Sequence, residues 1–316
     1  MPAKFLRSIL ITGGTSGLGY HCALNVARKY PDYQIIIASR SDPNSSANAL
    51  NNALNQKNVR FLPLDLSSLA QWETNQFPPI HSLVFNAALQ FPGDVQYSID
   101  GFEKTFAISH IGHALLFSLL RPHLADMARV VIVSSGTHDP AQKSGMPDAY
   151  YSSAGELAHP TGQSLKNNGR QRYSTTKLVN VLYGYALHRR FEAINKKSGK
   201  HWTVAAFDPG FMPGTGLARD YSALQRFLWL KVLPKILPLL RLLLTPNTHT
   251  VEHSGKMLAR LVIESDEEIG SGAYYEGPKR IKSSDASYDQ DKQECDGRSR
   301  PRNNFISKRS SIDEEN

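Results

Sequence analysis

Cysteine is scarce in this sequence, which has only Cys22 and Cys295 among its 316 residues. Two distant cysteines cannot build a disulfide framework and suit a reducing compartment, so we expect a cytoplasmic protein. Long apolar runs are also missing. The nearest candidate for a spanning helix, 227–244, is interrupted by three basic residues and two prolines. No run reaches the roughly 18 apolar residues of a spanning helix. A glycine-rich motif begins by Gly13, which leaves no room for a signal peptide.

Blocks of like charge are absent as well. The formal net charge is +8, but Lys and Arg are scattered along the chain, and no basic block resembles an arm for nucleic acid. We therefore expect no nucleic-acid partner, whereas an anionic ligand or an acidic membrane surface is compatible with the charge. The chain does have 41% hydrophobic residues, enough for the core of one large α/β domain or two small ones.

Short apolar runs rich in Val and Ile alternate with longer helix-like segments. The runs that read as buried strands are 8–12, 34–39, 59–65, 82–88, 129–135, 203–209 and, more weakly, 272–277. The helix-like segments are 18–30, 68–76, 101–126, 173–196 and 249–264. This order predicts an α/β fold, a Rossmann-type doubly wound parallel sheet of about seven strands with helices on both faces. Ligands of such sheets bind beyond the carboxyl ends of the strands.

The stretch "TGGTSGLG" (12–19) follows the first strand and opens a helix, which is the context of a phosphate-binding turn. Gly13 permits the tight turn, Gly17 lets the backbone approach a pyrophosphate, and Gly19 lets the helix pack on the sheet. The helix N-terminus would then face the anion. We assign the other residues of the turn to the same cofactor site: Thr15, Ser16 and Leu18. Leu18 also breaks the nucleophile-elbow pattern G-x-S-x-G, which argues against an α/β-hydrolase.

The end of the second strand indicates which dinucleotide binds. An acid there would bind the ribose 2′-hydroxyl of NAD, but the strand ends in Ser39 and Arg40. No carboxylate repels a 2′-phosphate at that point, and the planar guanidinium of Arg40 can pair with one. This pattern favours NADP(H). A solvated surface arginine is the alternative, and the nearby Asp42 weakens the argument.

The stretch "RYSTTKLVNVLYGYAL" reads as an amphipathic helix on which Tyr173 and Lys177 share a face. An ammonium beside a phenol favours the phenolate, so we expect the pKa of Tyr173 to fall below its usual value of about 10. A phenol tuned in this way can exchange a proton with a substrate oxygen. Ser135 follows a predicted strand at the rim where a nicotinamide is expected, so these three residues are candidate catalytic groups.

These pieces occur in one order along the chain, together with "LDL" (64–66), "NAA" (86–88), "VSS" (133–135) and "DPG" (208–210). In this combination the sequence resembles the short-chain dehydrogenase/reductase family, in its single-domain form, over roughly residues 5–277. Within the family, "SR" after the second strand, "SHIGHALL" and "PGFMPGTGL" are most similar to the branch of retinol dehydrogenases and protochlorophyllide reductases.

The resemblance implies a role for each matching residue. Tyr173 would be the general acid in reduction and the general base in oxidation, while Lys177 would lower its pKa and hold the nicotinamide ribose. Ser135, rather than Ser134, would bond the substrate oxygen. The other matching residues would line the cofactor groove: Asp65 and Leu66 beside the adenine, Asn86 and Ala87 along the groove, and Pro209, Gly210 and Thr215 on the carboxamide side. The nicotinamide supplies the hydride, and the protein supplies position and protons.

One position departs from the branch. An asparagine normally precedes the "H-x-G-H" segment, where it supports a water that relays protons to the lysine, and here that residue is Ser109. Its shorter side chain either holds the relay through an additional water or leaves it impaired. The two histidines that follow, His110 and His113, share a helix face but are too few to bind a metal. We interpret them as packing or hydrogen-bonding residues and expect no metal.

We assign residues 1–277 to a single dinucleotide-binding catalytic domain, followed by a polar, charged tail, 278–316, predicted to be mostly disordered. Within the tail, 283–294 looks like the approach to a final helix, but the residues after it abandon any amphipathic pattern. The last packing element is therefore expected to be missing or altered.

An insert at 136–172 interrupts the domain and is expected to form a rim over the substrate with Tyr150, Tyr151 and Leu157. A surface excursion without a role is the alternative. Ser135, just before the insert, and His138 and Asp139 near its start suggest a hydrolase triad. Members of a triad usually come from separate segments, so we interpret His138 and Asp139 as parts of a turn.

A substrate lid is expected at 211–248, and its apolar part, 223–244, implies an apolar or bulky substrate. Basic residues along that part also suit contact with a membrane surface, and a helix pair packed on the core is the third reading. The sequence thus predicts an NADP(H)-dependent oxidoreductase acting on a carbonyl or secondary alcohol of an apolar compound. A dinucleotide-binding scaffold or sensor with little turnover is the alternative, which Ser109 and the tail motivate.

Overall fold

One sheet organises the chain, and the computed structural model describes residues 5–68, 77–216 and 221–297. The strand order is β3-β2-β1-β4-β5-β6-β7-β8. The strands are β1 (Arg7–Thr12), β2 (Tyr33–Ser39), β3 (Val59–Pro63), β4 (Ile80–Phe85), β5 (Leu124–Val133), β6 (His201–Asp208), β7 (Ala273–Glu276) and β8 (Lys279–Ile281). All neighbours pair in parallel except β7 and β8. The predicted doubly wound sheet is confirmed, with β8 as an additional antiparallel edge.

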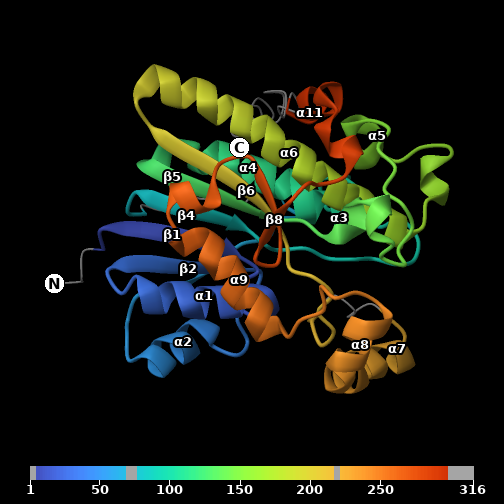
Figure 1. Cartoon of the computed structure of the whole chain (residues 1–316), viewed down its shortest axis with the longest axis horizontal. Coiled ribbons are helices and arrows are strands. Elements are labelled where there is room, and N and C mark those ends of the chain that lie inside the picture. The colour runs from blue at the N-terminus through green and yellow to red at the C-terminus, as the bar shows by residue number, and fades with distance from the viewer. Residues whose placement is uncertain (1–4, 69–76, 217–220, 298–316) are drawn as a thin grey trace, which may run out of the picture.

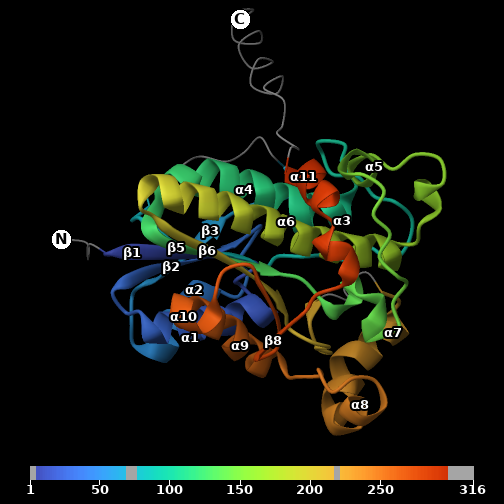
Figure 2. The same cartoon turned by 45° about the horizontal axis from the view of Figure 1, so that its top comes forward.

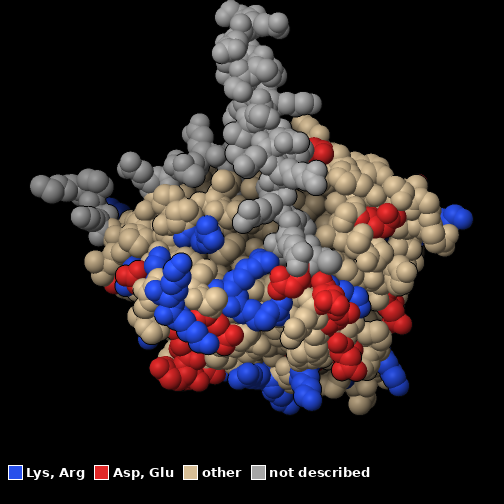
Figure 3. All heavy atoms as spheres, turned by 90° about the horizontal axis from the view of Figure 1, so that it is seen from above, with Lys and Arg blue, Asp and Glu red and all other residues tan. Residues whose placement is uncertain are grey.

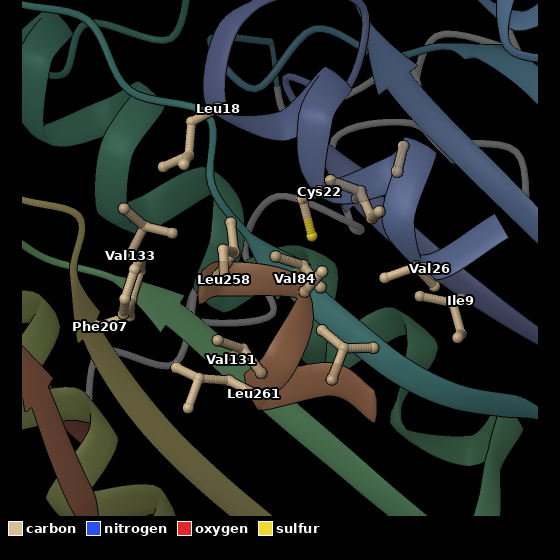
Figure 4. Packing of buried hydrophobic residues seen from close by; sticks show 14 of the residues in the cluster. Ile9, Leu18, Cys22, Val26, Val84, Val131, Val133, Phe207, Leu258 and Leu261 are labelled. Carbon is tan, nitrogen blue, oxygen red and sulfur yellow. The ribbon is translucent and has the colours of Figure 1, made fainter. Parts of the chain in front are cut away.

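Helices cover both faces of this sheet (Figure 1). On one face lie α1 (Gly17–Lys29), α2 (Ser46–Leu54) and α9 (Val251–Ile263), and on the other α4 (Gly112–Leu120) and α6 (Gly169–Ser198). Alternate strand residues supply the two cores, since Ile9 and Ile11 pack with α1 and α9 whereas Leu10 packs with α4 and α6. Figure 4 shows the first core, in which Cys22 lies among Val84, Val131 and Leu258.

The segment predicted as one helix at 101–126 is divided. It forms α3 (Lys104–Phe106), a π-helical turn (Ala107–Ile111), α4 and a 3₁₀ turn (Arg121–His123), after which β5 begins at Leu124. The last residues of the predicted helix therefore belong to a strand. The predicted helix at 68–76 lies outside the described residues from 69 onward. The helix α2 was not predicted, because its serine and three asparagines are residues of low helix propensity.

The insert and the lid both leave the sheet. The insert contains short 3₁₀ turns (Gly136–His138, Pro140–Gln142 and Ser164–Lys166) and α5 (Ala154–Ala158). The lid contains α7 (Ala223–Phe227), a π-helical turn (Leu228–Val232), a 3₁₀ turn (Leu233–Ile236) and α8 (Leu237–Leu243). In Figures 1 and 2, α7 and α8 stand out together from one side of the body, at the end of a loop that leaves β6.

The segment after residue 277 is ordered as far as it is described, so the prediction of disorder is wrong for 278–297. After α10 (Asp266–Ile269) and β7 come β8, a 3₁₀ turn (Asp285–Tyr288) and α11 (Gln290–Gly297). Polar contacts hold this segment where apolar periodicity is absent: the Tyr185 and Tyr288 rings stack at 5.2 Å, and Arg189 binds Glu294 at 2.9 Å. A final packing element is thus present.

The described helices include none that is both long and apolar enough to cross a membrane. On the face seen in Figure 3, basic and acidic side chains are interspersed, as the scattered charges of the sequence suggested.

Candidate active site

A cavity of about 810 Å³ opens beyond the carboxyl ends of β1, β2, β4, β5 and β6. This is the edge at which ligands of doubly wound sheets bind. Nearly all of the predicted site residues line it: Gly13, Thr15, Ser16, Gly17, Leu18, Ser39, Arg40, Asp65, Leu66, Asn86, Ala87, Ser135, Tyr173, Lys177, Pro209, Gly210 and Thr215. Gly19 and Ser109 are the two that do not line the cavity.

The glycine-rich turn has the conformation that its sequence predicts. Gly13 and Gly17 have φ angles of +65° and +56°, which side chains rarely adopt. A Cβ on Gly19 would lie 2.4 Å from the Gly13 carbonyl oxygen, so Gly19 lets α1 pack closely against the turn. Because α1 begins at Gly17, with Ser16 as its N-cap residue, unpaired N–H groups of the helix face the cavity.

Thr12, which was not predicted as a site residue, forms the hydrogen bonds beneath the glycine-rich turn. Its hydroxyl accepts hydrogen bonds from the amides of Asn86 at 2.9 Å and Ala87 at 3.0 Å. The Asn86 side-chain amide donates in return to the Thr12 carbonyl at 2.7 Å. These bonds join the ends of β1 and β4 where the strand order reverses. A buried threonine ending a strand beside a glycine turn was the available signal.

The end of β2 carries Ser39 and Arg40, as predicted. The Thr15 hydroxyl donates to Ser39 Oγ at 3.0 Å, so the glycine turn and the strand end form one wall of the cavity. Arg40 is exposed at the cavity rim. The carboxylate of Asp42 accepts from the Ser46 amide at 2.8 Å and the Ala47 amide at 3.3 Å, at the start of α2. Asp42 therefore stabilises a helix terminus.

The adjacent wall is formed by Asp65 and Leu66. Asp65 Oδ1 accepts from both the amide and the hydroxyl of Ser67, at 2.9 and 2.7 Å, which fixes the loop after β3. Gly112 packs directly against this loop, since a Cβ there would lie 2.5 Å from the Leu66 carbonyl oxygen. The glycine of the "H-x-G-H" segment thus lets the central helix approach the predicted adenine side.

The three candidate catalytic residues meet at the end of β5. Tyr173 and Lys177 come from α6, with the Lys177 ammonium 5.4 Å from the centre of the Tyr173 ring. Lys177 Nζ donates to the Val133 carbonyl at 3.0 Å. Ser135 lies just past the strand and forms a hydrogen bond with the Tyr173 side chain. The Ser134 hydroxyl donates to the Lys177 carbonyl at 2.8 Å, so its position is structural and Ser135 is the serine of the site.

The predicted direction of the Tyr173 pKa shift is wrong. Burial raises the pKa of this phenol, and the charge of Asp208 raises it further, while the hydrogen bond with Ser135 opposes the shift. Burial also lowers the pKa of Lys177, to about 8. The prediction rested on the charge of Lys177 alone, but in this site desolvation of each group is the larger effect.

Asp208 is a site residue that the sequence analysis missed. It ends β6, is 3% exposed and lines the cavity with Tyr173 and Lys177. Its carboxylate accepts from the Gly210 amide at 3.0 Å and from Asn247 Nδ2 at 2.9 Å. Burial raises the pKa of Asp208 to about 6. The signal was the acid in "DPG", at the carboxyl end of a predicted strand.

Ser109 lies away from the cavity surface. It is 1% exposed, belongs to the π-helical turn before α4, and its hydroxyl oxygen has no hydrogen-bond partner in the described part of the chain. The Ser109 hydroxyl therefore forms no hydrogen bond with Lys177.

The two histidines after Ser109 pack and form hydrogen bonds, as interpreted from the sequence. His113 bonds the Thr12 hydroxyl at 2.8 Å and stacks on Phe85 at 4.9 Å, and burial lowers its pKa to about 3. His110 bonds Asn180 at 3.3 Å and stacks on Phe106. Among the residues that the structure describes, no group of three ligand-type side chains could hold a metal.

The turn after Ser135 does not form a hydrolase triad. His138 Nδ1 bonds the Ser135 backbone carbonyl at 2.7 Å, and its Nε2 accepts from the Ser284 amide at 3.1 Å. Both ring nitrogens thus face the backbone. The Asp139 carboxylate accepts from the Ala141 amide at 3.0 Å, so both residues support a turn, as interpreted.

The rim comes from other residues of the insert than those predicted. Tyr151 and Leu157 pack with Phe106 and Val179 away from the cavity, and Tyr150 is 62% exposed. The insert residues that line the cavity are Gly136, Thr137, Gln142, Lys143, Ser144, Gly145 and Met146. On the opposite side, Trp229, Leu243 and Leu244 of the lid line the cavity. The Trp229 indole donates to the Thr215 carbonyl at 2.9 Å, which ties the lid to the nicotinamide-side loop.

The chain matches known proteins over most of its length. The family model described as short chain dehydrogenase matches residues 7–158. The chain is 30% identical to the protochlorophyllide reductase of Pisum sativum, over 86% of this chain and 70% of that protein. It is 33% identical to the polyprenol dehydrogenase of Homo sapiens, over 66% of this chain but only 62% of the relative.

Solved structures share the fold. The crystal structure of a protein from Mycobacterium Paratuberculosis superposes with a TM-score of 0.65 and 22% sequence identity, over 93% of this chain and 92% of that chain. At this identity the similarity concerns the fold alone.

Proposed function

The chain belongs to the short-chain dehydrogenase family, an oxidoreductase family whose fold binds NAD or NADP, and we propose that it is an NADP(H)-dependent reductase of apolar carbonyl compounds. The observation that carries this proposal is that Ser135, Tyr173 and Lys177 line one cavity with the glycine-rich turn. A proton donor and a dinucleotide cradle thus share a single space.

The residues present fit a dinucleotide. Gly17 has open space where a side chain would project, and the adjoining N-terminus of α1 offers backbone donors to a pyrophosphate. Asp65 and Leu66 would flank the adenine, Lys177 would hold the nicotinamide ribose, and Gly210 would border the carboxamide. When bound, the cofactor supplies a hydride to a carbonyl carbon or accepts one from an alcohol.

Side chains of the protein would supply the proton that reduction of a carbonyl requires. Because burial raises the pKa of Tyr173, its phenol keeps its proton near neutral pH and can give it to a carbonyl oxygen. Ser135 would donate a hydrogen bond to the same oxygen and orient it. Lys177, whose pKa is about 8, is largely protonated at neutral pH and would stabilise the phenolate left behind. The protonated phenol is the form that reduction requires, because a proton must reach the carbonyl oxygen.

The choice of NADP(H) over NAD(H) rests on Arg40. It is exposed at the cavity rim next to Ser39, where it would pair with a 2′-phosphate. Asp42, the acid that weakened this argument from sequence, has its oxygens engaged by the amides of α2. It therefore offers less repulsion to a phosphate than a free carboxylate would.

The substrate class follows from the other end of the cavity. Phe211, Met212, Trp229, Leu243 and Leu244 contribute apolar side chains there, and such surface binds apolar molecules best. One relative is named for a polyprenol, which agrees with an apolar substrate. We propose a bulky apolar ketone or aldehyde as the substrate class.

The test is oxidation of NADPH by the purified protein with a panel of apolar ketones and aldehydes. We expect turnover with some of them, and a loss of about 10²- to 10⁴-fold in Tyr173→Phe, with NADPH binding retained. Tyr150→Phe, at an exposed tyrosine, is the matched control and should keep full activity. Tight NADPH binding without turnover on any compound, unchanged by Tyr173→Phe, would instead identify a scaffold or sensor.

A further inference from the structure

The lid presents an unusually apolar outer surface. Eight large apolar side chains of 223–244 are exposed, from 41% for Leu228 to 82% for Leu242. The other six are Leu224, Phe227, Leu230, Leu239, Leu243 and Leu244. Only Leu237 and Leu240 of the segment are buried. Soluble proteins rarely expose so many large apolar side chains in one segment unless that segment binds something.

Hydrogen bonds hold the lid helices α7 and α8 in a defined conformation. A capping box between Ser222 and Gln225 starts α7, and Arg241 Nε donates to the Thr248 carbonyl at 2.7 Å near the end of α8. The exposed leucines therefore lie on a formed surface. Figures 1 and 2 show α7 and α8 projecting from the body, away from the sheet. A flat, extended partner could reach them without contacting the rest of the protein.

The charged residues of 223–244 are all basic. Arg226, Lys231, Lys235 and Arg241 are all exposed, and no Asp or Glu occurs from 222 to 250. Leucines flanked by cations form the pattern of a segment that lies in the interface of an anionic bilayer. Each Lys or Arg near such a surface strengthens binding by about fivefold.

We propose that residues 223–244 dock this protein on the surface of a membrane that contains anionic phospholipid. A second copy of the chain fits less well as the partner, because a twofold contact would bring the same four cations against each other. A bilayer accepts the leucines among its acyl chains and the cations among its phosphates. It therefore satisfies both features of the surface.

Docking has a consequence for the cavity. Leu243 and Leu244 belong to the exposed leucines of the lid and also line the cavity, so the docked lid would bring the cavity mouth to the bilayer. If the proposed function holds, an apolar substrate dissolved in the membrane enters there without crossing water. Membrane binding itself does not depend on turnover.

The experiment is flotation of the purified full chain, without cofactor or substrate, with vesicles of phosphatidylcholine alone or with added phosphatidylserine. We expect flotation with the mixed vesicles and little with phosphatidylcholine. Soluble phosphoserine should not compete. Because no activity is measured, failure of the proposed function would leave this result intact, and the reverse also holds.

Two matched pairs of variants locate the surface. Leu224→Ser, Leu239→Ser and Leu242→Ser combined should reduce binding at least tenfold, whereas Leu6→Ser, Ile99→Ser and Leu165→Ser, at exposed positions elsewhere, should not. Lys231→Gln with Lys235→Gln should remove most of the phosphatidylserine dependence, and Lys196→Gln with Lys197→Gln, on α6, should leave it unchanged.

Three outcomes would overturn the proposal. One is the absence of flotation with either kind of vesicle. Another is an equal loss of vesicle binding in the lid variants and the control variants. The third is a concentration-dependent dimer, seen by sedimentation, that the lid leucine variant converts to monomer while vesicles fail to bind. That result would identify a second copy of the chain as the partner.

Discussion

The side-chain amide of Asn247 donates a 2.9 Å hydrogen bond to the carboxylate of Asp208, which joins the loop after α8 to the end of β6 inside the candidate active site. The other carboxylate oxygen of Asp208 accepts from the Gly210 amide. One buried acid thus positions the nicotinamide-side loop and acts electrostatically on Lys177. This double role makes Asp208 the most informative residue to change.

Asp208→Asn should move the alkaline limb of the reduction rate to lower pH. The Asp208 carboxylate raises the pKa of Lys177 against the larger, opposing effect of burial, so removing its charge lets Lys177 lose its proton earlier. The check is a pH profile of kcat/KM with NADPH. Glu276→Gln, which neutralises a different acid near Asp208, should leave the limb in place. If the alkaline limb of the profile were unchanged in Asp208→Asn, the ionisation of Lys177 could not be the cause of that limb.

Asp208 also predicts a pH dependence of stability. Burial raises its pKa from 3.8 to about 6, so the folded protein holds the proton more tightly than the unfolded chain. The stability from this group is complete below about pH 4 and is lost as pH rises through about 6. Two pKa units correspond to about 3 kcal/mol. Between these pH values, the free energy of unfolding of the wild type, measured in urea, should fall by about that amount relative to the free energy of Asp208→Asn. Parallel pH dependences of the two proteins would contradict the prediction.

Arg40→Ala should weaken NADPH binding by about ten- to a hundredfold and leave NADH binding nearly unchanged. A hydrogen-bonded charge pair contributes about 1.5–3 kcal/mol, and only the 2′-phosphate of NADPH would form one here. Titration calorimetry with both cofactors gives the comparison. Arg28→Ala, at an exposed arginine that does not line the cavity, controls for net charge. Equal losses for the two cofactors would refute the assignment of NADP(H).

The sheet, the glycine turn and most of the site were predictable because they depend on local signals. Apolar runs fix the strands, and strand ends of a parallel sheet must share one edge, which brought Arg40, Asn86 and Ser135 together correctly. The direction of the Tyr173 pKa shift was not predictable from such local signals. It depends on how deeply the phenol is buried and on Asp208, which is 35 residues away in sequence. Burial of that kind is a property of the whole fold.

Two buried serines offer a paired test of the proton relay. The Ser109 hydroxyl has no hydrogen-bond partner among the described residues, so Ser109→Ala should leave both stability and turnover unchanged. Ser109→Asn should preserve turnover or raise it if the relay of the family operates here. Ser134→Ala removes a 2.8 Å bond to the Lys177 carbonyl and should cost about 1 kcal/mol. Thermal unfolding and steady-state kinetics measure both. A large loss of turnover in either Ser109 variant would show that the proton path depends on serine.

The order of 278–297 was missed for a physical reason, and it can be tested through one ring. Sequence patterns detect helices by apolar periodicity, but this segment is held by stacking and polar contacts.

Tyr288 stacks on Tyr185 and its hydroxyl accepts from the Tyr185 hydroxyl at 3.3 Å and from the Ser283 amide at 3.3 Å. Tyr288→Ala should therefore lower the free energy of unfolding by about 1–3 kcal/mol. Tyr150→Ala, at a more exposed tyrosine, should cost well under 1 kcal/mol, as surface changes usually do. Equal effects of the two substitutions in urea unfolding would mean that the segment contributes little to stability, and the polar contacts would then describe only its position.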